Sequence, residues 1–444
     1  MKIKYLHIFI SALLLAGLSA CEKFLDIEPK GSVIPQTEEQ YRALITNAYS
    51  RFPTDRGLAM FRSDEVQLDT ADSFGETSYF DIYTWNDNAQ ADFTASFQWK
   101  DYYHIIYLAN HIIDELANAD GLSSGLAQIV GEAYCLRAYA HFTLACLFAP
   151  PYADATLGEP AVPLALNTNT EVVLSRSTVA EVYASVASDI AQAQAYLNVQ
   201  RPAVSTAYRW TQQAAWAFGS RLNLYMGQWQ RAIDDANRAL MLGGALINLN
   251  QSVMMLPCDY RSPETILALD FVVTPDYRKA TRPANDLINL FRATDDLRFK
   301  DITFKEESPG AYRIAIDATT SAYRTTFRVA ELLLNKAEAY AQLGNADSAR
   351  ACLFTLKRTR LKPAYFTTDS TAVAALNGDA LLQAVLDERA RELAFQGHRW
   401  FDLRRTSQKR LLHEHKGKLY VLPQADSRYT IPIPKEARES NALL

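Results

Sequence analysis

Most of the chain carries apolar residues at the three- and four-residue spacing of amphipathic helices. The periodic segments that we expect to be helices are 37–49, 93–117, 126–147 and 178–197. Capping boxes open the first and the last of them, Thr37 with Gln40 and Thr178 with Glu181. Pro150 stops the third, because proline cannot continue a helix. The pattern therefore predicts a helical scaffold.

Two later segments share one spacing of bulky and small residues. The pattern is a bulky residue, a small residue, a glycine at the turn and then small residues again. It is typical of tetratricopeptide helix hairpins, in which small residues lie where antiparallel helices approach closely. The two units are far apart in the chain, whereas a regular solenoid of this kind repeats every 34 or so residues. The positions are Trp216, Ser220, Gly227, Ala232 and Ala239 in the first unit and Leu333, Ala337, Gly344, Ala349 and Leu356 in the second.

Irregular stretches separate these helices. Residues 51–92 lack a clear period, and 150–175 and 243–325 are rich in proline and glycine. Short β-like runs occur at 265–273 and 312–316. We predict a mainly α fold, with a tetratricopeptide-like helix-hairpin scaffold, long irregular insertions and a few short strands.

Residues 381–405 read as an amphipathic helix followed by a tight turn. Glu388, Arg391 and Glu392 lie three and four residues apart, within side-chain range on one face. Gly397 marks a left-handed cap at the end of the helix. We interpret the charged group as an ion-pair network that holds this helix against the scaffold.

The first residues have the layout of a bacterial lipoprotein leader. Lys2 and Lys4 precede an apolar stretch over 5–18 that is short for a membrane span. Leu18-Ser19-Ala20-Cys21 then matches the lipobox, in which the cysteine is acylated and becomes the first mature residue. We expect a signal peptide over 1–20 and a lipid anchor on Cys21; the alternative is an ordinary cleavage site that happens to precede a cysteine.

Composition excludes one class of partner. Of the 444 residues, 49% are hydrophobic, and the formal net charge is −5. A mildly acidic chain without a basic run has no electrostatic footprint for nucleic acid. Cys135 and Cys146 lie on one predicted helix about 16 Å apart, too far for a disulfide. With Cys258 and Cys352 they are predicted to be small buried hydrophobic residues.

Aromatic and polar residues alternate over 79–99 and form the first candidate binding site. Aromatic rings can stack on a sugar while amides and carboxylates bind its hydroxyl groups, although the same mixture also builds an ordinary core under a loop. Trp99, inside a predicted helix, is expected in the core, whereas Trp85 and Tyr83 lie where exposure is expected. The candidate ligand-binding residues are Trp85, Asn86, Tyr83, Tyr79, Arg62 and Asp64. For Arg62 and Asp64 the alternative is that they form an ion pair with each other instead of binding ligand.

Other candidates carry weaker signals. The sequence has no H-E-x-x-H or Walker A motif, and no cofactor is expected. His413-Glu414-His415 has two possible metal ligands without a third nearby, which is typical of a solvated loop. A catalytic pair of carboxylates, as in a glycosidase, stays an open alternative, because nothing in the sequence singles out a particular pair. A second aromatic pool in the long insertion comprises Tyr260, Phe271, Tyr277, Arg278, Tyr312 and Tyr323.

Several blocks resemble one family in its order along the chain. The stretch 388–405, ER-x-REL-AF-x-G-x-RW-x-DL-RR, closely resembles the C-terminal signature of the SusD/RagB outer-membrane nutrient-binding lipoproteins. Residues 331–360 resemble the preceding helix pair, 131–147 the mid-chain helix and 21–49 the N-terminal opening of that family. By this resemblance the domains are a leader (1–20), an N-terminal SusD-like part (21–240) and a C-terminal part with the loop insertion (241–444).

The resemblance also implies a function. Family members tend to bind glycans through a loop before the 93–117 helix, which favours Trp85 and Asn86. The expected protein is a non-catalytic lipoprotein, anchored in the outer membrane and facing outward, that binds an oligosaccharide. It would deliver this ligand to a SusC-like TonB-dependent transporter as a lid over the barrel. Two alternatives stay open: a peptide- or protein-binding member of the same fold, and a surface glycoside hydrolase.

Overall fold

The structure is a computed structural model that describes residues 35–252, 254–316, 319 and 321–444. The expected signal peptide and Cys21 lie outside the described residues. Within them, none of the helices has both the length and the apolar character needed to cross a membrane.

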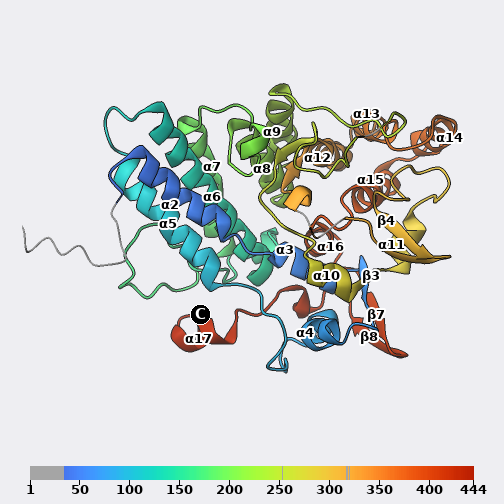
Figure 1. The fold of residues 1–444 in the computed structure, drawn as a ribbon, viewed down its shortest axis with the longest axis horizontal. Helices are drawn as coiled ribbons and strands as arrows, with labels where there is room; N and C mark the ends of the chain where they lie inside the picture. Colours follow the sequence, from blue (N-terminus) through green and yellow to red (C-terminus); the bar gives the residue numbers. More distant parts are fainter. Residues whose placement is uncertain (1–34, 253, 317–318, 320) are drawn as a thin grey trace, which may run out of the picture.

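Helices that follow one another in the chain pack side by side and form the scaffold (Figure 1). The scaffold helices are α2 (Glu38–Ser50), α5 (Lys100–Leu116), α6 (Ser124–Phe148), α7 (Val179–Tyr196), α8 (Gln212–Tyr225), α9 (Trp229–Met241), α12 (Val329–Gln342) and α13 (Ala346–Lys357). The first four of these helices lie together at one end of the molecule. Helices α8, α9 and α12 lie next to them, and α13 lies toward the other end.

The two predicted hairpins are confirmed. The turn between α8 and α9 contains Gly227 and the turn between α12 and α13 contains Gly344, both in the left-handed region, with φ of +68° and +74°. The hairpins pack against each other through α9 and α12, and the Asn335 amide donates to Ser220 Oγ from α12 to α8. Both predicted capping boxes are also present. Small residues therefore allow the close helix approach that their spacing predicted.

The region before α5 differs from the sequence expectation. Residues 51–92 contain α3 (Asp55–Leu58), the 3-10 helix η1 (Ala59–Arg62), β1 (Val66–Leu68) and α4 (Ser73–Tyr83). The helix predicted from 93 begins only at Lys100. The side chain of Asp81 accepts hydrogen bonds from Ala91 N and Thr94 Oγ1, which hold this segment in a loop against α4.

The other elements lie in the insertions and in the C-terminal part of the chain, and most of them are short. The strands form two-stranded antiparallel sheets, β1 with β3, β2 with β6, β4 with β5 and β7 with β8. These elements are β2 (Thr265–Leu267), α10 (Pro275–Ala280), β3 (Thr281–Pro283), α11 (Asn285–Leu290), β4 (Phe304–Ser308), β5 (Ala311–Ile314), β6 (Phe327–Arg328), α14 (Pro363–Ala374), α15 (Gly378–Glu392), α16 (Arg399–Arg405), β7 (Leu411–His415), β8 (Lys418–Leu422), α17 (Lys435–Ser440) and the 3-10 helices η2 (Asp154–Thr156), η3 (Val204–Thr206), η4 (Ser321–Tyr323) and η5 (Ser427–Tyr429).

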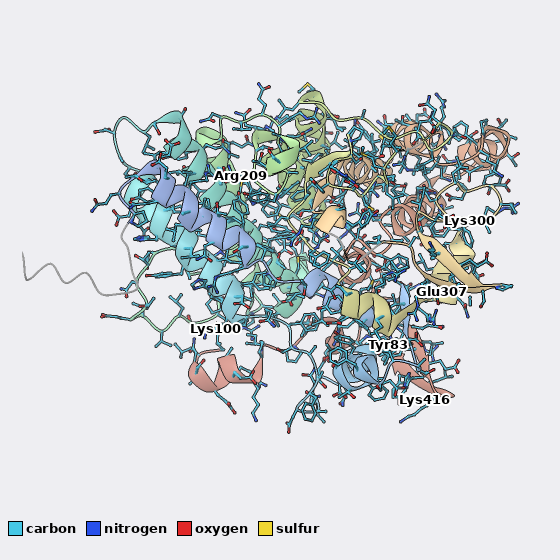
Figure 2. The ribbon with its side chains drawn as sticks, viewed as in Figure 1. Tyr83, Lys100, Arg209, Lys300, Glu307 and Lys416 are labelled. Carbon is cyan, nitrogen blue, oxygen red and sulfur yellow. The ribbon has the colours of Figure 1, made fainter. Side chains whose placement is uncertain are left out.

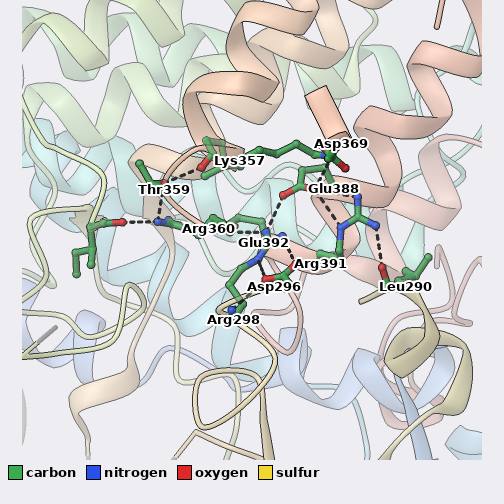
Figure 3. Close-up of polar contacts among 12 residues, drawn as sticks. Leu290, Asp296, Arg298, Lys357, Thr359, Arg360, Asp369, Glu388, Arg391 and Glu392 are labelled. Atoms are coloured by element: carbon green, nitrogen blue, oxygen red, sulfur yellow. Dashed lines mark hydrogen bonds and ion pairs between the residues drawn. The ribbon is translucent and has the colours of Figure 1, made fainter. Parts of the chain in front are cut away.

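A buried network of charges fixes α15 to segments from the insertion and the scaffold (Figure 3). The Glu392 carboxylate accepts from Arg328 at 2.6 Å and from Arg360 and Arg298 at 2.9 Å. Arg391 donates to Glu388 at 2.8 Å, so the predicted ion pairing on this helix is confirmed. We call the following set the Glu392 network: Glu264, Asp296, Arg298, Arg328, Arg360, Glu388, Arg391 and Glu392.

Candidate functional site

The aromatic residues predicted to contact ligand are buried. Tyr79 and Tyr83 lie on the inner face of α4, and Trp85 follows this helix with only 1% of its surface exposed. Tyr79 stacks on Phe61 at 4.5 Å between ring centroids, while Tyr83 and Trp85 each stack on His413 at 4.1 Å. The expected exposure of Trp85 and Tyr83 is therefore wrong, because α4 turns their rings toward the protein interior.

The polar members of the predicted set also contact protein groups. Arg62 is fully buried and donates to both carboxylate oxygens of Asp87, at 2.6 and 2.8 Å. Asp64 accepts from Arg399 at 2.7 Å and does not pair with Arg62, so the alternative pairing is wrong. The Asn86 amide is partly exposed and donates to Asp81 Oδ1 at 2.8 Å, inside the loop after α4. In this arrangement the six residues connect segments of the fold.

Two neighbours of this set differ from it. Trp99, expected in the core within a helix, lies just before α5; its ring is partly buried, packs against the main hydrophobic core and contacts Tyr103 and Phe148. Glu65 is buried, accepts a hydrogen bond from Phe395 N at 3.0 Å and is not directly paired with a cation among the described residues. Burial raises the pKa of the Glu65 carboxyl to about 8.

The histidines of the β7–β8 hairpin are buried rather than solvated. His413 lies between the rings of Tyr83 and Trp85, and burial lowers its pKa to about 4. His415 lies on the same face of β7 and contacts Glu76 at 3.0 Å. Tyr83 is fully buried, and Figure 2 shows Lys416 at the outer tip of this hairpin. The interpretation as a solvated loop is therefore wrong, because alternation along the strand turns both imidazoles inward.

One cleft brings partly exposed aromatic and polar side chains together, with a volume of about 390 Å³. Tyr208, in the segment between η3 and α8, and Tyr260, in the long insertion, both line it. Arg209, the residue after Tyr208, is labelled in Figure 2. Buried Ala207, Ala268 and Leu269 provide apolar surface, and Ala268 N donates to Ala207 O to join the two segments. We call this the tyrosine cleft.

Polar groups surround this apolar surface. Tyr208 packs edge to face on Tyr49 at 5.3 Å, and Arg324 donates to Leu269 O at 3.2 Å. Tyr49 is itself fixed by donating to Glu132 at 2.9 Å, and burial raises its pKa well above the ordinary value. Thr46, Ser50 and Ser205 contribute hydroxyl groups, and no acidic side chain is among the residues that line the cleft. Rings, hydroxyls and a guanidinium around an apolar surface can bind a polyhydroxylated ligand.

Sequence reasoning found only part of the tyrosine cleft. Tyr260 belongs to the predicted second pool, whereas Tyr277 of that pool is buried against Thr54, and Arg278 donates to Ile314 O. Tyr208 and Arg324 were missed. A tyrosine next to an arginine in a short segment between two helices, Tyr208-Arg209, is a signal that could have identified this position.

Comparison with known families and structures is consistent with this fold. A family model described as starch-binding associating with outer membrane matches residues 23–224, and the SusD family model matches residues 282–443. A SusD-like protein of Formosa agariphila is 23% identical over an alignment covering 91% of this chain and 92% of that protein. A SusD superfamily structure from Bacteroides fragilis has a TM-score of 0.77 at 22% identity, covering 93% of this chain and 100% of that one.

A laminarin-binding SusD-like protein has a TM-score of 0.62 at 19% identity, covering 84% of this chain and 92% of that one. At these identities the solved structures establish the fold alone. The two family models match opposite parts of the chain in the family's order and together cover most of it. The chain therefore belongs to the SusD/RagB family.

Proposed function

We propose that this protein binds an oligosaccharide at the tyrosine cleft without transforming it. The observation that carries this proposal is the convergence of Tyr208, Tyr260 and Arg324 around a buried apolar surface. The rings offer stacking surface to the apolar face of a pyranose, and the guanidinium offers donors to its hydroxyl groups. A structural relative described as laminarin-binding supports this ligand class.

The lining of the cleft argues against the glycoside hydrolase alternative at this site. Glycosidases generally use two carboxyl groups on either side of the scissile bond. No aspartate or glutamate is among the residues that line the tyrosine cleft. Binding without hydrolysis is therefore the chemistry that this site supports.

We infer that the bound saccharide is delivered to a SusC-like TonB-dependent transporter in the outer membrane. Membership of the SusD/RagB family supports this partner, together with a position on the cell exterior. The chain would act as a lid that closes over the barrel and encloses the ligand between the two proteins. A lipid on Cys21 would supply the anchor.

Calorimetric titration with neutral oligosaccharides tests the ligand class and the site together. Tyr260→Ala and Tyr208→Ala are expected to weaken binding by about tenfold each, because each removes a stacking ring. Tyr107→Ala removes an exposed tyrosine of α5 outside the cleft and should leave the affinity unchanged. Tight binding of peptides in place of glycans, or full affinity in both cleft variants, would reject the proposal.

Contact between ligand and the six residues around α4 stays a prediction, and the same titrations test it. Asn86→Ala is the informative variant because Asn86 is partly exposed. A loss of affinity in this variant, with the fold intact, would assign the α4 region to the ligand site. Trp85→Ala is expected instead to lower stability, since the ring is buried against His413.

The anchor has its own test. Cys21→Ala should release the protein from the membrane fraction, because acylation of this thiol is the attachment that we propose. Retention of the variant in membranes would contradict the lipoprotein assignment and leave the cleft unaffected.

A further inference from the structure

A second cleft lies on different elements from the tyrosine cleft and is lined by three arginines. It has a volume of about 390 Å³, and its lining comes from the loop after α4, the end of α6, the segment before α7, residues 427–433 and α17. The three side chains are Arg176, Arg428 and Arg438. We call it the arginine cleft. Arginines from three separate segments meet at one concave surface, although the chain as a whole carries a net negative charge.

Two of these arginines have no carboxylate partner among the described residues. Arg176 donates to the main-chain oxygens of Pro160 and Ala161, at 2.5 and 2.7 Å. Arg438 donates to Ile433 O at 3.1 Å. Main-chain oxygens satisfy single N–H groups but do not neutralise the charge. Each of these guanidinium groups therefore has N–H groups left over for another acceptor.

The acidic residues at this cleft are already engaged. Asp87 is the only acidic side chain in the lining, and both of its oxygens accept from Arg62. Arg428 pairs with Asp426 at 2.9 Å. The side chains of Asp87 and Asp426 are thus each matched by one arginine, whereas Arg176 and Arg438 have no such partner among the described side chains.

A further unneutralised arginine lies behind the cleft. Arg404 of α16 is buried and donates to the main-chain oxygens of Cys146, Ala149 and Tyr429, which lie one or two residues from positions that line the cleft. Burial lowers the pKa of both Arg176 and Arg404, and no carboxylate of the described segments offsets this effect. In the Glu392 network the opposite holds, since Glu264 and Glu392 raise the pKa of Arg360 against burial. Three arginines at or behind the arginine cleft, Arg176, Arg404 and Arg438, therefore lack a carboxylate partner among the described residues.

We propose that the arginine cleft binds the anionic group, carboxylate or sulfate, of an acidic saccharide. Guanidinium groups bind planar or tetrahedral oxyanions through paired N–H donors, and such charge-assisted bonds are stronger than those to neutral hydroxyls. Phe148, Ile431 and Ile433, which are themselves buried, form an apolar base beneath the arginines in the same lining. The inference extends the proposed function to a second site and to an acidic class of ligand.

The test compares three tetrasaccharides by calorimetry on the full-length protein in detergent: tetragalacturonate, a sulfated carrageenan tetrasaccharide and neutral laminaritetraose. The double variant Arg176→Gln/Arg438→Gln should lose about tenfold or more in affinity for at least one acidic ligand and none for the neutral one. If the double variant binds tetragalacturonate more weakly than the wild type does, the anionic group recognised is a carboxylate. If it binds the carrageenan tetrasaccharide more weakly, the group is a sulfate. The affinity of the wild type for that ligand should also fall as salt is raised.

Matched variants keep the result interpretable. Arg231→Gln removes an exposed arginine of α9 outside the cleft and should behave as the wild type. Arg438→Gln alone should show part of the loss, and it keeps the main-chain contacts of Arg176. Equal affinity of wild type and double variant for both acidic ligands, or no binding of either by the wild type, overturns the proposal. Failure of the tyrosine cleft is a separate result, seen as unchanged laminaritetraose binding in Tyr260→Ala.

Discussion

The Glu392 network and the arginine cleft are both rich in arginine, but they differ in what neutralises the charge. In the network, each guanidinium contacts at least one carboxylate within 3 Å, and Glu392 contacts three of them. In the cleft, Arg176 and Arg438 contact main-chain oxygens. A balanced group of buried charges holds segments together, whereas an unbalanced group leaves donors for a ligand. Charge balance, rather than the number of arginines, therefore separates a structural cluster from a candidate binding site.

The largest effect is expected on breaking the network. Glu392→Gln places an amide N–H₂ where an oxygen accepts from the arginines, and leaves Arg298, Arg328 and Arg360 short of negative charge. We expect the free energy of unfolding to fall by about 3–5 kcal/mol. Chemical denaturation followed by circular dichroism measures this change.

Glu439→Gln is the control for that experiment, because Glu439 forms an exposed pair with Lys435 at 3.6 Å on α17. It should leave the unfolding midpoint unchanged. If both variants unfolded at the same denaturant concentration, the network would not be what holds α15 in place.

The second largest effect is expected at Glu65, a buried carboxyl that has no ion-pair partner in the part of the chain that the structure describes. Its pKa is about 8 in the folded chain against 4.5 for the free group, so between these values the native state holds a proton that the unfolded state has lost. The free energy of unfolding therefore falls as pH rises through this window. Glu65→Gln should remove that loss and be more stable than wild type by on the order of 3 kcal/mol at pH 8.

Urea unfolding of both proteins at a series of pH values between about 4 and 8 measures this difference. The two curves should meet at the acid end, where wild-type Glu65 is protonated in both states. A constant offset between them across the range would show that Glu65 does not titrate as its surroundings predict.

The smallest effect is expected at the arginine cleft. Arg438 is exposed and has no carboxylate to lose, so Arg438→Gln should change the free energy of unfolding by less than about 0.5 kcal/mol without ligand. Thermal unfolding in buffer of low ionic strength measures it. A clear destabilisation would show that Arg438 is structural, and the contrast with the Glu392 network would disappear.

The sequence predicted the parts of the fold that depend on local spacing. The hairpin register around Gly227 and Gly344 and the pairing of Glu388 with Arg391 follow from residues a few positions apart. The partners of Glu392 could not be predicted in the same way, because Arg298 and Arg360 are brought to it only by the packed fold. Local periodicity specifies helices, while long-range contacts arise when the helices assemble.

The same limit explains why the candidate site was predicted only in part. Trp85 follows α4, a helix that was not predicted, and this helix turns Tyr83 inward. Its start signal, Asp72 as the capping residue, is common in turns and therefore weak. Tyr208 and Tyr260 both line the tyrosine cleft, although the hairpin of α8 and α9 separates them in the sequence. No residue spacing along the chain predicts that these two tyrosines lie close together.

The contacts of Arg404 have a consequence for the order of assembly. The side chain caps the carboxyl end of α6 by donating to Cys146 O and Ala149 O, although α6 belongs to the first half of the chain. These two acceptors stay without their donor until residue 404 has been synthesised. Ribosome-bound fragments that stop before α16 should therefore keep a frayed α6 terminus and be cut there by proteases. The early helices can complete their packing only after the last part of the polypeptide has been synthesised.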